Sequence, residues 1–159
     1  QMTITALLSE ALPIGIGATV VMDLWALLLR RLGVTTLNFA MVGRWAGHLL
    51  RGRVWHAAIA NARPVRHERA WGWVIHYVIG VCFAVAFVLM AGEGWLRAPT
   101  LGPALAFGVG TAVAPLCLMQ SAMGAGSFAC RTAALVLGCL KSVLTHGVLG
   151  VGLFMVAVV

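Results

Sequence analysis

The chain has 159 residues, of which 62% are hydrophobic and only 9% are charged, and its mean hydropathy is +1.00. A folded domain of this size leaves about a third of its unfolded surface exposed, so a water-soluble fold is excluded and we predict an integral membrane protein. The net charge of +7 does not indicate a nucleic-acid partner, because eight of the eleven Lys and Arg residues lie together between positions 30 and 69.

Four apolar stretches predict an all-α membrane protein, a single domain of four transmembrane helices that covers residues 1–159. Each stretch has about the 20 residues that a helix needs to cross a bilayer. The predicted spans are residues 11–29, 70–90, 100–119 and 137–158, with a short outer turn at 91–99 and a Gly- and Ser-rich connection at 120–132. The positive-inside rule places the basic loop 30–69 in the cytoplasm and both termini in the periplasm.

Two prolines bear on the shape of these spans. Pro13 is expected at the start of the first span, where a helix tolerates proline. Pro115 lies inside the third span and predicts a bend near Ala112.

The basic loop contains a helical pattern of its own. Met41, Trp45 and Leu49 recur at every fourth position, and basic residues follow the same spacing on a neighbouring face. This favours a cytoplasmic helix lying in the membrane interface, although a basic loop without fixed structure is the alternative. Anionic lipid headgroups are the expected partners of the loop, unless its charges only set the topology. The candidate headgroup or ligand residues are Arg44, His48, Arg51, Arg66 and Arg69.

Cysteine spacing and sequence motifs give no sign of catalysis. Four cysteines, at positions 82, 117, 130 and 139, show no C-x-x-C spacing and are interpreted as small packing residues. The chain has no phosphate-binding G-x-x-x-x-G-K-[ST], no H-E-x-x-H and no G-x-S-x-G motif. We therefore predict no metal and no cofactor, and we lean towards a protein that is not an enzyme.

Ionisable side chains inside the predicted spans are the main functional candidates, because each costs on the order of 3 kcal/mol to place in a bilayer. Asp23 lies roughly 10 Å from the cytoplasmic boundary at 1.5 Å per residue, and His76 lies at a similar depth in the second span. Lys141 lies at the same level unless the fourth crossing begins near it. We expect Asp23 to pair with Lys141 or to accept a hydrogen bond from His76. Such a contact serves either helix register or proton and ion handling.

Two apolar spans each place a His four residues before a Gly, at His76 and Gly80 and again at His146 and Gly150. A weaker echo precedes each copy, GIGATV at residues 15–20 and GVGTAV at residues 108–113. The pattern indicates either a two-fold internal duplication or a chance match of Gly- and Val-rich spans. The two histidines are either ligands of a b-type haem or donors to neighbouring backbone carbonyls, and we favour the second role.

Four segments together carry a family resemblance: GIGATVVMDLW at 15–25, GRWAGH at 43–48, RHERAWGWVIHY at 66–77 and MQSAMGAG at 119–126. In these segments the chain resembles a bacterial family of small integral membrane proteins that is known only as a domain of unknown function. The resemblance implies a location in the bacterial inner membrane and brings no activity, substrate or cofactor.

The leading functional interpretation is a small inner-membrane transport or channel protein that works as a homo-oligomer within the lipid bilayer. Asp23 is the expected proton- or ion-coupling group, with His76, His146 and Lys141 beside the path. Milder polar lining is expected from Thr19 and Gln120. The alternatives are a membrane redox or lipid-modifying enzyme, and a structural subunit of a membrane complex.

Overall fold

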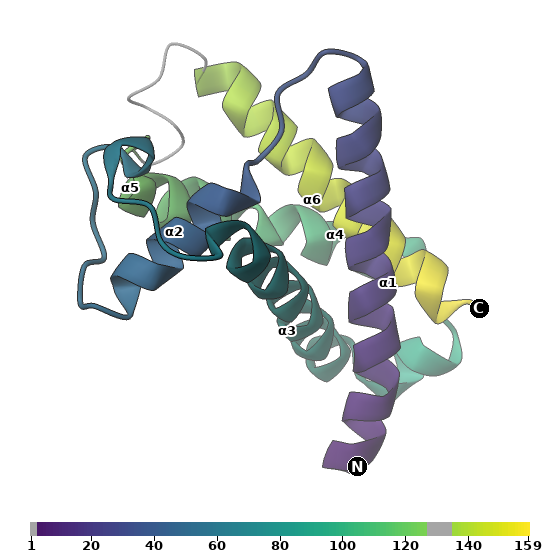
Figure 1. The fold of residues 1–159 in the computed structure, drawn as a ribbon. Helices are drawn as coiled ribbons and strands as arrows, with labels where there is room; N and C mark the ends of the chain where they lie inside the picture. The colour runs from purple at the N-terminus through teal and green to yellow at the C-terminus, as the bar shows by residue number, and fades with distance from the viewer. Residues whose placement is uncertain (1–2, 127–134) are drawn as a thin grey trace. The chain divides into compact units, whose positions relative to one another are not determined.

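The computed structural model describes residues 3–126 and 135–159 (Figure 1). Cys130 and residues 127–132 of the predicted connection at 120–132 therefore lie outside the described residues. The elements in the described part are α1 (Ile4–Arg31), α2 (Phe39–Leu49), η1 (Ile59–Asn61), α3 (Glu68–Arg97), α4 (Leu101–Thr111), η2 (Ala114–Met119), α5 (Gln120–Met123) and α6 (Leu135–Ala157). All of them are helical.

Four helical stretches are long and apolar enough to cross a membrane: Ile4–Arg31, Glu68–Arg97, Leu101–Met123 and Val136–Ala157. They coincide with the four predicted spans, so the chain is a multi-pass membrane protein of the all-α class. The helix predicted inside the basic loop is α2. Its N-terminus is capped by Asn38, whose side chain accepts a hydrogen bond from the amide of Ala40 at 3.0 Å.

The helix α1 begins seven residues before the predicted first span. Thr3 caps it by accepting a hydrogen bond from the amide of Ala6 at 3.2 Å, and the amide of Leu7 bonds to the carbonyl of Thr3 at 2.9 Å. Pro13 consequently lies inside α1 and not at its start. The helix continues through it because one missing amide donor is a local loss, whereas the capped first turn and the apolar face favour helix on both sides.

The helix α3 changes direction at the outer turn. Gly92 has φ 76° and ψ 176°, a conformation that interrupts the helix and that glycine adopts without a Cβ clash. A short helical piece then ends at Arg97. Trp95 is 7% exposed, and its indole N–H donates to the carbonyl of Thr100 at 3.0 Å.

The third span is interrupted near the position predicted from Pro115. The regular helix α4 ends at Thr111, and the π-helical segment η2 contains Pro115. A proline inside a helix cannot donate its backbone hydrogen bond, and a π-turn is one way in which the chain accommodates this loss.

The chain divides into two compact units. Unit 1 comprises Gln1–Thr36, Tyr77–Thr111 and Leu144–Val159, and unit 2 comprises Leu37–His76 and Ala112–Val143. The apolar core of unit 1 is formed by Ala11, Ile14, Ala18, Ala84, Phe87, Val88, Trp95, Ala104, Leu149 and Leu153. Of the described cysteines, Cys117 and Cys139 are partly buried, whereas Cys82 is exposed on α3, so packing does not account for Cys82.

Two pairs of helices in unit 1 cross at glycines. A Cβ atom on Gly15 of α1 would lie 2.6 Å from the Cα of Val81 on α3. A Cβ atom on Gly108 of α4 would lie 2.5 Å from both the amide nitrogen of Gly150 and the carbonyl oxygen of His146 on α6. Small residues allow such close backbone approach between membrane helices. These crossings use the echoed glycines of the two half-sequences, and the duplication itself stays a prediction.

Candidate functional site

The first polar contact in unit 1 joins α1 to α3. The hydroxyl of Tyr77 donates a hydrogen bond to Oδ2 of Asp23 at 2.8 Å. Asp23 follows Gly15 by about two helical turns and Tyr77 precedes Gly80 by about one, so the same faces that cross at glycine carry the contact. Both side chains are partly buried. The contact therefore holds an acidic group next to a hydroxyl inside two candidate membrane spans.

Thr19 lies between this contact and the glycine crossing. Its side chain is fully buried, and its hydroxyl donates to the carbonyl of Gly15 at 2.7 Å. Gly80 leaves the room that the Thr19 hydroxyl occupies, because a Cβ on Gly80 would collide with it. The predicted lining residue is thus a tightly packed part of the α1–α3 crossing.

A second contact joins α4 to α6. Oγ1 of Thr111 lies 2.8 Å from Nδ1 of His146, and the same hydroxyl donates to the carbonyl of Gly108 at 2.6 Å. One hydroxyl hydrogen cannot serve both bonds. When Thr111 donates to Gly108, His146 therefore carries a proton on Nδ1, and its Nε2 is the basic nitrogen. A third contact joins α1 to α6, where the indole N–H of Trp25 donates to Thr145 Oγ1 at 3.3 Å.

These three contacts form what we call the polar layer, made of Asp23, Trp25, Tyr77, Thr111, Thr145 and His146. Along the chain, Asp23 and Trp25 follow Gly15 in α1 and Tyr77 precedes Gly80 in α3. Thr111 likewise follows Gly108 in α4, and Thr145 and His146 precede Gly150 in α6. Most of the buried core residues of unit 1 lie in the other direction along each helix from these glycines, among them Ile14, Phe87, Ala104 and Leu153. Carboxylate and imidazole groups can both bind and release protons, so the polar layer contains proton-binding chemistry.

The remaining predicted polar residues belong to unit 2. The ring of His76 lies with its centroid 4.5 Å from that of Phe39 and 6.0 Å from that of Trp73. Lys141 and Gln120 also lie in unit 2, and Oε1 of Gln120 is buried without a hydrogen-bond partner in the described part of the chain. The expected pairing of Asp23 with Lys141 or His76 stays a prediction, as does haem binding by His76 and His146.

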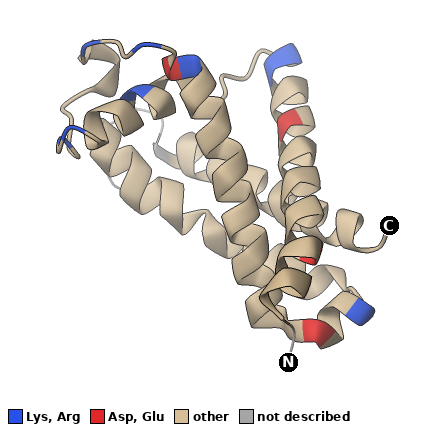
Figure 2. Cartoon of the chain, turned by 60° about the horizontal axis from the view of Figure 1, so that its bottom comes forward, with Lys and Arg blue, Asp and Glu red and all other residues tan. Residues whose placement is uncertain are grey.

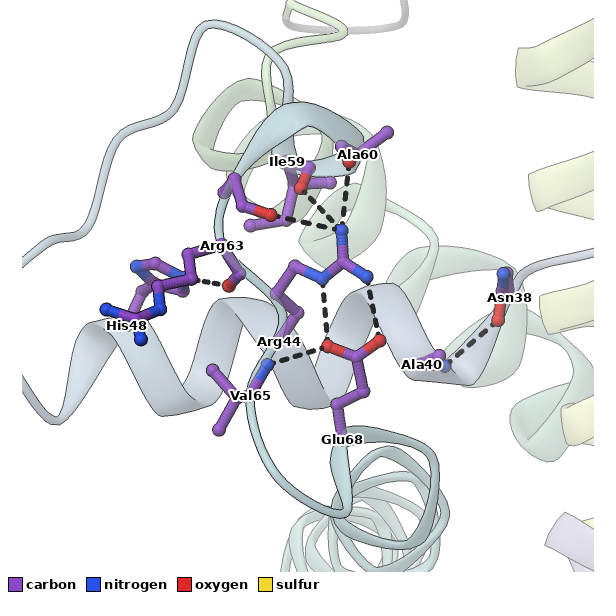
Figure 3. A network of polar contacts seen from close by, with 10 residues as sticks. Asn38, Ala40, Arg44, His48, Ile59, Ala60, Arg63, Val65 and Glu68 are labelled. Carbon is purple, nitrogen blue, oxygen red and sulfur yellow. Dashed lines mark hydrogen bonds and ion pairs between the residues drawn. The ribbon is translucent and has the colours of Figure 1, made fainter.

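An ion pair between the buried Arg44 and the partly buried Glu68 joins α2 to the start of α3 in unit 2 (Figure 3). Arg44 on α2 binds Glu68 at the start of α3 through two hydrogen bonds, from Nε to Oε2 at 2.8 Å and from Nη2 to Oε1 at 2.7 Å. Its Nη1 donates to the backbone carbonyls of Ala60 at 2.9 Å and Ala62 at 3.2 Å. The bonds to Glu68 raise the pKa of Arg44. The guanidinium, predicted to contact lipid headgroups, is instead only 8% exposed and occupied by protein acceptors.

A pair of buried histidines adjoins this network. Nε2 of His48 lies 2.9 Å from the carbonyl oxygen of Arg63, and the ring centroids of His48 and His56 are 5.1 Å apart in an edge-to-face arrangement. His56 is 6% exposed, and its ring nitrogens have no hydrogen-bond partner among the described residues. Burial, followed by the charges of Arg53 and His48, lowers the pKa of His56. His48 therefore faces the interior, whereas Arg51, Arg66 and Arg69 are exposed.

The chain matches the family model described as "Protein of unknown function (DUF2938)" over residues 12–159. It belongs to the DUF2938 family. This membership agrees with the resemblance drawn from the four sequence segments, and it assigns the DUF2938 protein no activity. No curated protein and no solved structure matches the chain.

Several residues of the DUF2938 polar contacts were not predicted. Tyr77 is the only tyrosine of the chain and lies inside an apolar span, and this was the available signal for its role. Thr111 lies in GVGTAV at residues 108–113, the segment that echoes GIGATV of the first half-sequence. The repeat therefore drew attention to this segment, but it did not indicate the hydrogen bond between Thr111 and His146. Nothing in the local sequence distinguishes the buried His56 from an exposed loop histidine.

Proposed function

We propose that this DUF2938 protein is a small transport protein of the bacterial inner membrane in which Asp23 binds and releases the coupling proton or cation. The hydrogen bond from Tyr77 to Asp23, made within two candidate membrane spans of one unit, is the observation that supports this proposal most strongly. A charged side chain at the centre of a membrane helix costs about 2.5–3.5 kcal/mol on insertion scales. An asparagine at this position could fix the register of the two helices at a lower free-energy cost, because its side chain is neutral. Helix register alone therefore does not explain why the side chain is a carboxylate.

The contact has two chemically distinct states. An ionised carboxylate accepts the hydrogen of Tyr77, whereas a protonated carboxyl group carries a donor of its own. Protonation therefore changes which group donates at the α1–α3 contact. In transport, this change is the step that couples proton binding to a rearrangement of the two helices.

The polar layer supplies the neighbouring groups for this step. His146, which is hydrogen-bonded to Thr111 through Nδ1, is a second proton-binding group within unit 1. The apolar core beyond the glycine crossings, which includes Ile14, Phe87 and Leu153, is the barrier that must open for a solute to pass.

The proposed topology places the loop between α1 and α3 in the cytoplasm and both termini in the periplasm. Figure 2 shows Lys and Arg concentrated in this loop and at the helix ends, while the long helices are almost free of charge. Large apolar side chains such as Leu24 (61% exposed) and Leu89 (64% exposed) remain on the outside of the spans. They face lipid or, in the homo-oligomer that we propose, a second copy of the chain.

The proposal is tested by flux through purified protein in proteoliposomes that contain a pH-sensitive dye. An imposed pH gradient, with Na⁺ or K⁺ supplied on the opposite side, should collapse faster than in empty liposomes, and Asp23→Asn should abolish the difference. Glu10→Gln is the matched control, because Glu10 is an exposed acidic residue on the same helix. A rate that is equal for the wild type and Asp23→Asn would refute the coupling role.

A further inference from the structure

The turn that follows α2 exposes large apolar side chains. Residues 49–55 read LLRGRVW, and we call them the membrane turn. Leu50 is 90% exposed and Trp55 is 66% exposed. Single exposed apolar residues are common, but a tryptophan and a leucine within one short turn form a patch that favours contact with an apolar phase.

This exposure belongs to an ordered turn. The amides of Arg51 and Arg53 both donate to the carbonyl of His48 at 3.0 Å, and Gly52 supplies the positive φ of 78° that the turn requires. The indole N–H of Trp45 donates to the carbonyl of Val54 at 2.9 Å and fastens the turn to α2. The turn therefore presents its apolar side chains in a fixed arrangement, and little conformational entropy is lost when it binds.

Unpaired positive charge accompanies the apolar side chains. Arg51 and Arg53 flank Gly52 and are exposed, and their side chains make no hydrogen bond or ion pair within the part of the chain that the structure describes. Glu68 is the only acidic residue in the sequence of unit 2, and Arg44 occupies both of its carboxylate oxygens. An anion that binds Arg51 and Arg53 therefore comes from outside unit 2.

The packing of α2 against α3 indicates which anionic partner lies close to the turn. Gly43 of α2 packs directly against the backbone of Glu68 and Gly72, and Gly72 packs against Phe39. Because α3 is a candidate membrane span that begins at Glu68, this packing attaches α2 and the turn after it to the end of that span. A tryptophan, aliphatic residues and arginines at a membrane boundary are the composition of an interfacial anchor.

We propose that the membrane turn is an anchor for anionic phospholipid, in which Leu50 and Trp55 enter the boundary between headgroups and acyl chains. Arg51 and Arg53 bind the phosphates of the same leaflet. This inference does not depend on the transport proposal. It moves the predicted headgroup site away from Arg44 and His48, which are buried, to the exposed side chains of the turn.

The test uses the full-length protein in nanodiscs with increasing fractions of phosphatidylglycerol in phosphatidylcholine. Hydrogen exchange of residues 49–55 should slow as phosphatidylglycerol increases. Arg51→Gln and Arg53→Gln should each raise the fraction needed for half-maximal protection about fivefold, which corresponds to the free energy of one basic residue at an anionic surface. Arg97→Gln is the matched control, because Arg97 is an exposed arginine with an 80% exposed side chain at the other end of α3.

Leu50→Ser with Trp55→Ser should remove the protection in every lipid mixture, while circular dichroism shows an unchanged helix content. Exchange at the same rate with and without phosphatidylglycerol would overturn the proposal. Equal protection of the detergent-solubilised protein by inorganic phosphate would also overturn it, because that result would indicate a soluble-anion site in place of a lipid surface.

Discussion

The crossing of α4 and α6 gives a prediction in which two glycines of one helix respond oppositely to the same substitution. In Gly108→Ala, the new methyl carbon would lie 2.5 Å from the amide nitrogen of Gly150 and 2.5 Å from the carbonyl oxygen of His146. Comfortable contacts between nonbonded atoms are about 3.5–4.0 Å, so the two helices must separate by roughly 1 Å. In Gly110→Ala, nothing lies within 4 Å of the added carbon.

The expected magnitudes follow from two opposing terms. Overpacking costs about 1–3 kcal/mol, and the upper end applies at Gly108 because backbone atoms cannot move aside by changing rotamer. Alanine gains about 1 kcal/mol over glycine inside a helix, which applies at both positions. The free energy of unfolding should therefore fall by about 2 kcal/mol in Gly108→Ala and rise by about 1 kcal/mol in Gly110→Ala.

Thermal unfolding in detergent, followed by circular dichroism, measures both effects. For a chain of this size 1 kcal/mol corresponds to about 2–4 °C, so the melting temperature should fall by roughly 4–8 °C in Gly108→Ala and rise by about 2–4 °C in Gly110→Ala. Equal melting temperatures for the two variants would refute the close approach of α4 and α6 at Gly108, and with it the parallel between the two helix pairs of unit 1.

Three further predictions concern the polar contacts. Glu68→Gln should destabilise unit 2 by about 3 kcal/mol, since it leaves the buried charge of Arg44 without its counter-ion, and hydrogen exchange in α2 should become faster. Arg97→Gln, at an exposed ion pair in unit 1, should cost less than about 1 kcal/mol and leave hydrogen exchange in α2 unchanged. Burial lowers the pKa of His56 below its unfolded value of about 6.5. The contribution of the neutral His56 to the free energy of unfolding should therefore be complete above about pH 6.5 and decline as the pH falls below it. Urea titrations at several pH values should show this decline, and His56→Phe should remove it. Tyr77→Phe removes the hydrogen bond that holds the Asp23 carboxylate, so the rate of flux should fall; a rate equal to that of the wild type would count against the hydrogen bond as part of the coupling site.

The spans were predictable because hydropathy and length describe a requirement that holds for every membrane helix. The interruption near Ala112 was also predictable, since the missing amide of Pro115 acts locally. The start of α1 was not, because it depends on a cap at Thr3 that lies outside the most apolar stretch. Hydropathy locates the buried part of a helix and says little about the turns that extend beyond it.

The basic loop shows where residue type alone misleads. The spacing of Met41, Trp45 and Leu49 correctly indicated α2, and the positive charges on its flank suggested a face towards lipid headgroups. Arg44 turns inward because Glu68, 24 positions later in the chain, provides a bidentate partner. A contact between residues so far apart leaves no periodic signal, and an arginine with such a partner is indistinguishable in sequence from one without it.

The candidate site was predicted in its ionisable groups and not in their partners. Asp23 and His146 stood out because charged and titratable side chains are rare in apolar spans. Their observed partners in unit 1, Tyr77 and Thr111, are residue types that occur in membrane helices without functional meaning. Only the relative rotation of α1 against α3, and of α4 against α6, determines which hydroxyl meets which ionisable group.

The most direct test of the account is infrared difference spectroscopy of the protein in lipid during a titration from alkaline to acidic pH. If Asp23 gains a proton inside the membrane, the wild type and Glu10→Gln should both show a carboxyl band that Asp23→Asn lacks. Replacing Tyr77 with Phe should change the frequency of this band, because it removes the hydrogen bond to the carboxylate. A spectrum of Asp23→Asn identical to that of the wild type would contradict the proposal that this aspartate carries the coupling proton.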